Sequence, residues 1–426
     1  MTVSAIAPSD FGSLGISARL LKILELKKLT TPTPIQHQSI PAALQGKDVL
    51  GIAQTGTGKT LAFGLPLIQR LDTNPGNALI ILPTRELALQ VGEALTPYCH
   101  AFDIRTAVLI GGIAYMHQMR DLQRKPRLII ATPGRLVDFM EQKKIDLSHT
   151  SVLVLDEADR MFDMGFAPQL TKIFKAMPKQ KQTLLFSATM PPTVLKLATV
   201  HMTQPLRIEV APAGTASANI EQEIFIIHRD AKLSLLERLL QDSTGTVLVF
   251  SRTKHGAKKI TATLRLMGHK AAEIHANRSQ SQRREALEGF KTGRYRILVA
   301  TDIAARGIDV TGIASVINFD LPDNLDDYVH RIGRTGRAGL TGKAISFATP
   351  DQRGDIRGIE KIIRKNLTIS KLPELPPHAQ QVRFAHVEED VDPRSRPRRP
   401  VAGRQPFRGN NNRPAAAPKA KSRGGW

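Results

Sequence analysis

The chain has 426 residues, with 60 Lys and Arg against 38 Asp and Glu, which gives a formal net charge of +22. Its hydrophobic content of 41% excludes a chain that is disordered throughout, and its length suits two or three domains. A single cysteine, Cys99, excludes an intramolecular disulfide and a cysteine-based zinc site, so we expect a reducing compartment and a cytoplasmic protein. The excess of basic residues indicates a polyanionic partner, either a nucleic acid or an anionic membrane surface.

The membrane is the less favoured of these two partners. No stretch approaches 18 uninterrupted apolar residues, so we expect no membrane span. The first residues lack the basic and then apolar order of a secretory signal, and no amphipathic helix accompanies the basic C-terminal region. The sequence therefore predicts no membrane partner.

Short apolar runs alternate with longer helical patterns, such as those at 61–71 and 85–95, through the first half of the chain. The runs expected to be strands lie at 48–53, 78–83, 105–110, 127–132, 151–156 and 182–189. Short, continuous β-branched runs are typical of strands buried on both faces of a parallel sheet. Their alternation with helices predicts an α/β fold with a doubly wound parallel sheet.

The same pattern occurs a second time, so we expect two α/β domains in tandem. The second set of expected strands lies at 223–228, 246–251, 270–275, 295–301, 314–320 and 343–349. Small residues, Pro and Gly mark a linker between the two sets. The predicted organisation is a first domain over 1–208, a linker over 209–220, a second domain over 221–370 and a tail over 371–426.

The end of the chain carries much of the charge. Residues 394–426 hold ten Lys or Arg and no Asp or Glu, which leaves twelve of the 22 net charges on residues 1–393. Because this stretch is rich in Pro, Gly, Asn and Ala, we expect a disordered, Arg-rich tail. It either solubilises the protein or contacts RNA, and the mixture of Arg with Phe407 and Trp426, which can stack on bases, favours RNA.

A glycine-rich loop follows the first expected strand and precedes a helical pattern. It reads Ala53-Gln54-Thr55-Gly56-Thr57-Gly58-Lys59-Thr60, which departs from the strict phosphate-loop pattern only in having Ala53 where Gly is usual. Its glycines let backbone N–H groups curl around phosphates, Lys59 would reach the β- and γ-phosphates, and Thr60 would ligate Mg²⁺. The alternative is a glycine-rich turn with an incidental lysine.

Acidic residues follow the strand expected at 151–156. Asp156 would hold Mg²⁺, and Glu157 would orient and polarise an attacking water, as in other nucleoside triphosphatases. An acidic helix N-cap is the alternative, since Asp and Glu also favour that position. The phosphate loop upstream favours the metal site. The apolar segment 161–166 just after it is assigned to packing.

In this context Asp156-Glu157-Ala158-Asp159 resembles the motif that names the DEAD-box family of ATP-dependent RNA helicases, in helicase superfamily 2. The resemblance covers about residues 10–370, with the motifs in family order, and implies two RecA-like domains. The segment 275–280, the run ATDIAARGID, and the short core with a basic tail further resemble the bacterial RhlE-like group.

The resemblance extends to an adenine-recognition motif upstream of the phosphate loop, Pro32-Thr33-Pro34-Ile35-Gln36. It implies that Gln36 reads the adenine edge through its amide, with Phe11 as the family's isolated upstream aromatic. The family usually has Gly and then Tyr or Phe where this chain has Lys28 and Leu29. Because an aliphatic side chain cannot stack on the base, this departure bears on adenine selectivity.

Several motifs resemble the family's RNA contacts. In the first domain these are Pro83, Thr84 and Arg85, Gly111 and Gly112, and Thr132, Pro133, Gly134 and Arg135. In the second domain they are Arg252, Thr301 and Asp302. A further second-domain motif, at 275–280 with Arg283, belongs to the resemblance without an assigned role. Hydroxyls, backbone N–H groups and arginines suit phosphate and sugar contacts, which carry no sequence information. Each first-domain motif, taken alone, is also compatible with a helix cap or a turn.

The remaining motifs resemble those that act on the nucleotide from the second domain or couple it to RNA. The resemblance implies that Arg334 and Arg337 are arginine fingers, which are catalytic together with Lys59, Asp156 and Glu157, and that Asp309 contacts the ribose. It also implies a coupling set of Ser187, Thr189, Asp159 and His330.

The function implied is an ATP-dependent RNA helicase, a hydrolase that binds RNA across two domains and uses ATP and Mg²⁺ to unwind short duplexes or remodel RNA and its protein complexes. A DNA helicase on the same two-domain scaffold and a non-enzymatic RNA clamp are the alternatives. The resemblance admits ribosomal precursors or RNA-decay proteins as partners. It leaves the physiological RNA and the oligomeric state open.

Overall fold

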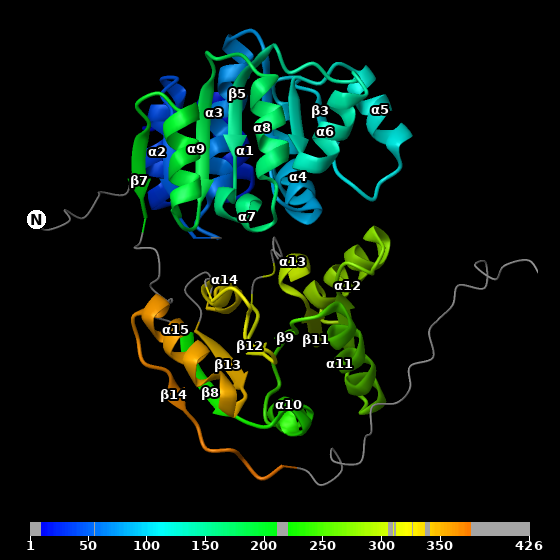
Figure 1. Ribbon diagram of the computed structural model, residues 1–426. Helices are drawn as coiled ribbons and strands as arrows, with labels where there is room; N and C mark the ends of the chain where they lie inside the picture. The colour runs from blue at the N-terminus through cyan, green and yellow to red at the C-terminus, as the bar shows by residue number, and fades with distance from the viewer. Residues whose placement is uncertain are drawn as a thin grey trace, which may run out of the picture. The chain divides into compact units, whose positions relative to one another are not determined.

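The computed structural model describes residues 10–54, 56–210, 220–305, 310, 312–325, 327–336 and 341–375. Within these ranges no helix is both long enough and apolar enough to cross a membrane. The predicted disordered tail, apart from its first five residues at 371–375, lies outside the described part of the chain. Two seven-stranded sheets, each with its own helices, make up the described part (Figure 1).

The first sheet has the strand order β3-β4-β2-β5-β6-β1-β7, and its neighbouring strands run parallel. Its strands are β1 (Val49–Ile52), β2 (Asn77–Ile81), β3 (Thr106–Leu109), β4 (Leu128–Ala131), β5 (Thr150–Leu155), β6 (Gln182–Ser187) and β7 (Leu206–Glu209). Its helices are α1 (Ala18–Leu26), α2 (Pro34–Leu44), α3 (Lys59–Thr73), α4 (Arg85–His100), α5 (Tyr115–Gln123), α6 (Pro133–Glu141), α7 (Ala158–Asp163), α8 (Ala167–Lys175) and α9 (Pro192–His201).

Two apolar cores hold this sheet between layers of helices. Val49 packs into the core under α1–α4, and its neighbour Leu50 packs into the core under α6–α9, because successive strand side chains point to opposite faces. Both residues are buried, as expected for a sheet covered on both sides. This double burial explains why the inner strands appear in the sequence as continuous apolar runs.

The second sheet has the order β10-β11-β9-β12-β13-β8-β14, again with parallel neighbours. Its strands are β8 (Ile220–Ile226), β9 (Val247–Phe250), β10 (Ala271–Ile274), β11 (Ile297–Ala300), β12 (Ser315–Asn318), β13 (Gly342–Ala348) and β14 (Thr368–Ile369). Its helices are α10 (Lys232–Gln241), α11 (Lys254–Leu266), α12 (Gln280–Lys291), α13 (Asp302–Ala305), α14 (Asp327–Ile332) and α15 (Arg353–Ile363). Single 3₁₀ turns lie at Arg229–Ala231 and Pro350–Gln352.

The predicted α/β class with two doubly wound parallel sheets is confirmed. All twelve expected strands are present, and the structure adds β7 and β14, which are sheet-edge strands with mostly exposed residues. The first set of strands ends with β7 at Glu209, and the second begins with β8 at Ile220. Residues 211–219 between them lie outside the described ranges.

The strand order decides where the predicted motifs meet. In the first sheet β6 lies between β5 and β1, so the chain segments that leave these three strands emerge at one sheet edge. The phosphate loop follows β1, the acidic motif follows β5, and Ser187 ends β6. Open parallel sheets bind ligands outside the carboxyl ends of their strands, where the strand order reverses. This edge is therefore the candidate site.

Candidate nucleotide and RNA sites

The phosphate loop turns tightly at two glycines with left-handed backbones. Gly56 has φ 89° and Gly58, the N-cap of α3, has φ 93°, and a side chain on Gly58 would also collide with the amide of Gln36. The Lys59 ammonium is buried at the start of α3, donates to the Ala53 carbonyl at 3.0 Å and lies 3.6 Å from the Asp156 carboxylate. The loop thus presents a lysine and a helix N-terminus beside a carboxylate. Thr55 lies outside the described residues.

The acidic motif is buried and strained. The Asp156 carboxylate accepts the Glu157 N–H at 2.9 Å, and burial raises the pKa of Asp156 although Lys59 opposes that shift. Glu157 has φ 54° and ψ 50°, a left-handed conformation that costs a residue with a side chain about 1–2 kcal/mol. The Glu157 Oε2 atom is buried and accepts no hydrogen bond from the described residues. Such an orphan acceptor is suited to a water molecule or another donor at this place.

The side chains at this edge fit a magnesium ion held jointly with a substrate. Within the described ranges no group of three or more His, Cys, Asp or Glu side chains could hold a metal by itself. Thr60, the second residue of α3, and Asp156 offer a hydroxyl and a carboxylate oxygen. Mg²⁺ prefers oxygen donors and is usually bound by one or two protein groups together with substrate phosphates and water.

Asp159 connects the acidic motif to the end of β6. Its N–H donates to the Ser187 hydroxyl at 3.1 Å, and its carboxylate accepts the Thr189 N–H at 2.9 Å and the Thr189 hydroxyl at 2.7 Å. Burial alone would raise the pKa of Asp159, but His330, the Thr189 hydrogen bond and Arg160 outweigh it and hold that pKa below its ordinary value. Ser187, Thr189 and Asp159, predicted as a coupling set, therefore form one hydrogen-bonded cluster.

The Gln36 amide is directed to the phosphate loop. Its Oε1 accepts the Thr33 N–H at 2.8 Å in a capping box on α2, and its Nε2 donates to the Gly58 carbonyl at 3.0 Å. Phe11, predicted as an adenine contact, is 3% exposed within the apolar core. Asp309, the predicted ribose contact, lies outside the described residues.

The two departures from the family pattern lie where α1 ends. The Lys28 N–H donates to the Glu25 carbonyl and the Leu29 N–H to the Leu24 carbonyl, which is a Schellman cap. Lys28 has φ 57°, the left-handed conformation that this cap requires and that glycine adopts most easily. Leu29 is 40% exposed. The cap therefore explains physically why glycine suits the position of Lys28.

A groove of about 520 Å³ collects the predicted first-domain RNA residues. All of them except Pro133 line it: Pro83, Thr84, Arg85, Gly111, Gly112, Thr132, Gly134 and Arg135. The Arg85 guanidinium lies over Gly111 and Gly112, where a β-carbon on Gly111 would approach it to 2.9 Å. The glycines therefore leave room for an arginine in the groove. Pro133 is the buried first residue of α6.

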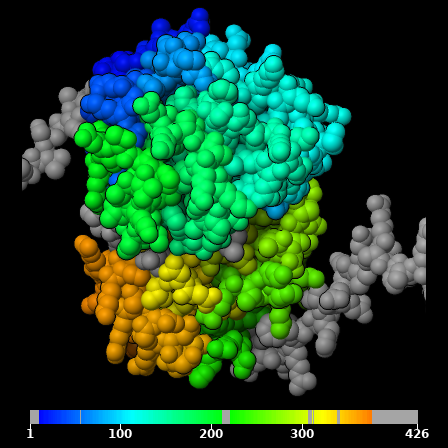
Figure 2. All heavy atoms as spheres, turned by 45° about the horizontal axis from the view of Figure 1, so that its top comes forward, coloured from blue at the N-terminus to red at the C-terminus, as the bar shows by residue number. Residues whose placement is uncertain are grey.

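The groove also contains residues that the sequence analysis did not assign to it. Met164 and Phe166, from the segment assigned to packing, line it, as do Ala276 from the loop after β10 and Arg283 from α12. Arg283 on α12 forms a buried 3.0 Å ion pair with Glu86 on α4. In Figure 2 the yellow-green atoms around α12 lie against atoms of the first sheet's part of the chain. In the sequence, the one signal for these residues is that they lie next to assigned motifs, as Glu86 lies next to Arg85.

The predicted RNA residues of the second domain lie elsewhere. Asp302 receives two hydrogen bonds from Arg331, at 2.5 and 2.7 Å, and lies in a different pocket from the groove. Arg252, after β9, forms a 3.2 Å ion pair with Asp323 and lines a third pocket. Thr301 follows β11, and its carbonyl accepts hydrogen bonds from the Ala304 and Ala305 N–H groups of α13. None of the three lines the groove.

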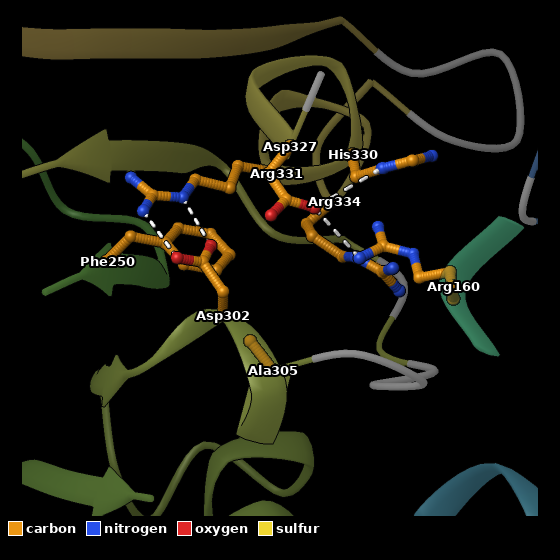
Figure 3. Close-up of a pocket in the computed structure, with 8 residues that line it drawn as sticks. All are labelled: Arg160, Phe250, Asp302, Ala305, Asp327, His330, Arg331 and Arg334. Carbon is orange, nitrogen blue, oxygen red and sulfur yellow. Dashed lines mark hydrogen bonds and ion pairs between the residues drawn. The ribbon is translucent and has the colours of Figure 1, made fainter. Parts of the chain in front are cut away.

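A second cluster joins residues of both sheets (Figure 3). Arg160 on α7 forms a 3.0 Å ion pair with Asp327 on α14, with exposed side-chain fractions of 3% and 10%. His330 and Arg334 line the same pocket, and Arg334 is buried. Burial and Arg160 lower the pKa of His330 below its ordinary value, although Asp327 opposes the shift. Arg337 lies outside the described residues.

Comparison with known proteins identifies the family. Residues 33–197 match the family model described as DEAD/DEAH box helicase, and residues 231–339 match that of the helicase conserved C-terminal domain. The DEAD-box ATP-dependent RNA helicase CshA of Bacillus cereus is 42% identical over 370 residues, which are 86% of this chain and 70% of the relative. This chain belongs to the DEAD-box family. CshA of Geobacillus kaustophilus, 41% identical, aligns with 86% of this chain over 79% of its own length.

Solved DEAD-box structures extend the similarity to three dimensions. S. cerevisiae Dbp5 bound to RNA and ADP BeF3 is 29% identical, with a TM-score of 0.77 over 85% of this chain and 95% of that chain. Mss116p bound to ssRNA and AMP-PNP is 27% identical, with a TM-score of 0.82 over 89% of this chain and 82% of that chain. Both sheets of this DEAD-box chain therefore have counterparts in proteins captured with RNA and a nucleotide.

Proposed function

We propose that this chain is an RNA-dependent ATPase that uses ATP to unwind short RNA duplexes or to remodel RNA and RNA–protein complexes. One observation carries the proposal: residues of both sheets meet in the same groove, beside a phosphate loop and an acidic motif that share one sheet edge. A site assembled from two domains can respond to two ligands at once. The likeness to Dbp5 and Mss116p, each bound to RNA and a nucleotide analogue, supports the same function.

Hydrolysis is assigned to residues at the sheet edge and to arginines of the second domain. Lys59 neutralises charge on the β- and γ-phosphates, and the free Glu157 Oε2 orients and polarises the attacking water. Arg334 and Arg337 neutralise the charge that develops on the transferring phosphoryl group. The buried position of Lys59 favours this electrostatic stabilisation, because charges interact more strongly away from water.

Nucleotide binding is assigned to the phosphate loop and the adenine motif. The loop residues Gln54, Thr55, Gly56, Thr57 and Gly58 cradle the phosphates, Gln36 and Phe11 serve the adenine end, and Asp309 contacts the ribose. Thr60 and Asp156 would hold Mg²⁺, which when bound supplies positive charge against the phosphates. The Gln36 amide, assigned to the adenine end, donates a hydrogen bond to the Gly58 carbonyl in the phosphate loop. This bond supports communication between the residues that bind the two ends of the nucleotide.

RNA is assigned to the groove, with Arg252, Thr301 and Asp302 as further contacts in the second domain. Arginines, hydroxyls and glycine backbones recognise phosphates and sugars, so little sequence preference is expected. The cluster of Ser187, Thr189 and Asp159, with His330, passes the nucleotide state to the second domain. If both ligands favour the closed arrangement, each strengthens the binding of the other.

The test measures phosphate release with and without single-stranded RNA. We expect RNA to stimulate hydrolysis and a DNA of the same sequence to stimulate it less, because 2′-hydroxyl contacts favour RNA. A high rate of ATP hydrolysis that does not change when RNA is added would contradict coupling between RNA binding and hydrolysis. Equal stimulation by DNA would favour a DNA helicase, and no hydrolysis at all would favour an RNA clamp.

Two finer assignments rest on the sequence. The RhlE-like subgroup is supported by residues 275–280 and the run ATDIAARGID, whereas the curated relatives compared above are named CshA. Ribosomal precursors or RNA-decay proteins are proposed partners. Sequencing RNA crosslinked in cells to a Glu157→Gln variant that retains ATP would distinguish these two kinds of target.

A further inference from the structure

The buried ion pair between Arg160 and Asp327 connects the helix that follows the acidic motif to the helix that precedes the predicted finger Arg334. Arg160 comes four residues after Asp156, and Asp327 begins the helix that leads to Arg334. The surrounding pocket holds only about 10 Å³, so at most one water fits beside the pair. The two charges therefore compensate each other largely without solvent.

The second-sheet end of the connection is rigid. Arg331, on the same helix as Asp327, is 1% exposed and donates to both carboxylate oxygens of Asp302 and to the Asp320 carbonyl. Its guanidinium also lies 5.0 Å from the centre of the Phe250 ring. These contacts attach α14 to the second sheet, and Arg334 follows this helix by two residues.

The first-sheet end is equally constrained. Arg160 lies on the six-residue helix α7, whose N-cap is the strained Glu157. The Arg160 N–H donates to the Asp159 carboxylate at 3.0 Å, and the other oxygen of that carboxylate holds Thr189. The Arg160 side chain is therefore placed by the same short segment that places the hydrolytic carboxylate.

We propose that Arg160 and Asp327 form a positioning pair that sets the register of Arg334 over the nucleotide site when the two domains close. The two side chains pair with each other, so both are assigned an effect through Arg334 and Glu157 and no contact with the nucleotide. The inference rests on the proposed function, since it concerns the closed state that hydrolyses ATP. The pair has a second effect: closure of the two domains depends on whether the buried charges of Arg160 and Asp327 compensate each other.

The charges around the pair explain this dependence. Three arginines line the pocket, Arg160, Arg331 and Arg334, against two aspartates, of which Asp302 is bound by Arg331. Loss of the Asp327 charge leaves Arg160 buried and poorly compensated beside Arg334. An unpaired charge in a dry site is strongly unfavourable, whereas removal of both charges costs little. The pair thus contributes more to the specificity of closure than to stability.

The test is a double-mutant cycle on RNA-stimulated ATP hydrolysis with Asp327→Asn, Arg160→Gln and the double variant. We expect Asp327→Asn to lower kcat about 30- to 100-fold and the double variant to recover about tenfold or more of that loss. The charge-swapped variant, Arg160→Asp with Asp327→Arg, should also exceed Arg160→Asp alone. Affinity for ATP without RNA and the unfolding temperature without ligands should match the wild type.

A matched control breaks an ion pair that lies on the surface. Lys172 and Glu141 are 2.7 Å apart and each 59% exposed, so Lys172→Ala should leave kcat unchanged. If the kcat losses of the two single variants simply multiply in the double variant, the proposal of a positioning pair is overturned. Single variants with wild-type kcat would overturn it as well. A wild-type protein without RNA stimulation would instead overturn the proposed function, so the two failures are distinguishable.

Discussion

At the scale of single residues, the candidate site combines several unfavourable features in one short segment. Glu157 combines a left-handed backbone with a buried oxygen that lacks a donor, and Asp156 beside it has its pKa raised by burial. Strain and unsatisfied polar atoms of this kind persist where the surrounding structure enforces them, and they cluster at functional sites. The left-handed backbone and the unpartnered buried oxygen therefore distinguish Glu157 from an ordinary helix N-cap.

Replacement of Glu157 by Gln tests its assigned role. The amide keeps the shape of the side chain but cannot accept a proton from water, so we expect kcat to fall by about 100-fold or more. ATP affinity, measured with a fluorescent nucleotide, should change by less than about threefold, and RNA should dissociate more slowly in the presence of ATP. The exposed Glu141→Gln is the matched control. Unchanged hydrolysis would exclude Glu157 from polarising the water.

The Schellman cap of α1 predicts a stabilising substitution at Lys28. Lys28→Gly removes the steric cost of φ 57°, so the free energy of unfolding should rise by about 0.5–1 kcal/mol. Lys27, one residue earlier with φ −87°, provides the control, because glycine there relieves no strain and only adds freedom to the unfolded chain. Denaturant unfolding of both variants gives the comparison. Equal or lower stability of Lys28→Gly would mean that the cap tolerates lysine without cost.

At the scale of elements, inner strands were predictable and edge strands were not. An inner strand such as β5 is apolar on both faces and stands out in the sequence, whereas β14 has two exposed residues and no such signal. Motif order likewise indicated residues that the structure brings together along one groove. The pairing of Glu86 with Arg283 was not predictable, because it joins residues 197 positions apart whose meeting depends on how two domains pack.

Glu273 on β10, together with the loop that follows this strand, offers a prediction for pH dependence. Burial would raise the pKa of Glu273, but hydrogen bonds from His275 and Arg278 outweigh it, so that pKa lies below its ordinary value. A lowered pKa in the folded state stabilises the protein above about pH 4.3, and this contribution disappears as the pH falls through the folded value. Because the loop after β10 also places Ala276 in the wall of the groove, loss of the Glu273 charge should loosen the groove wall at Ala276.

The measurement compares the unfolding free energies of the wild type and Glu273→Gln between pH 7 and pH 3. The wild type should be the more stable protein at neutral pH, and the difference should shrink below about pH 4.3. The exposed Glu141→Gln variant should show a small difference that varies little with pH. A Glu273 difference that is constant over the whole range would show that the charge of Glu273 contributes nothing.

At the scale of the whole molecule, the basic residues behind the net charge of +22 have two different roles. Buried cations such as Lys59, Arg160 and Arg331 are paired with carboxylates inside the protein. Arg85 and Arg135 line the groove. The ten positive charges of residues 394–426 have no acidic residue among them in the sequence. Electrostatic attraction to RNA is therefore expected to come from the groove and from this segment.

Deletion of residues 394–426 separates these contributions. Each phosphate neutralised by a protein cation releases counterions, so the slope of log K against log salt for single-stranded RNA becomes shallower as cations are removed, by up to about 7 for ten contacts. ATP affinity should remain unchanged, because the phosphate loop lies in the first domain. A variant of full length with these Lys and Arg replaced by Gln distinguishes charge from chain length. If that variant keeps the wild-type slope and affinity while the deletion lowers the affinity, the segment acts through stacking by Phe407 and Trp426 and not through its charge.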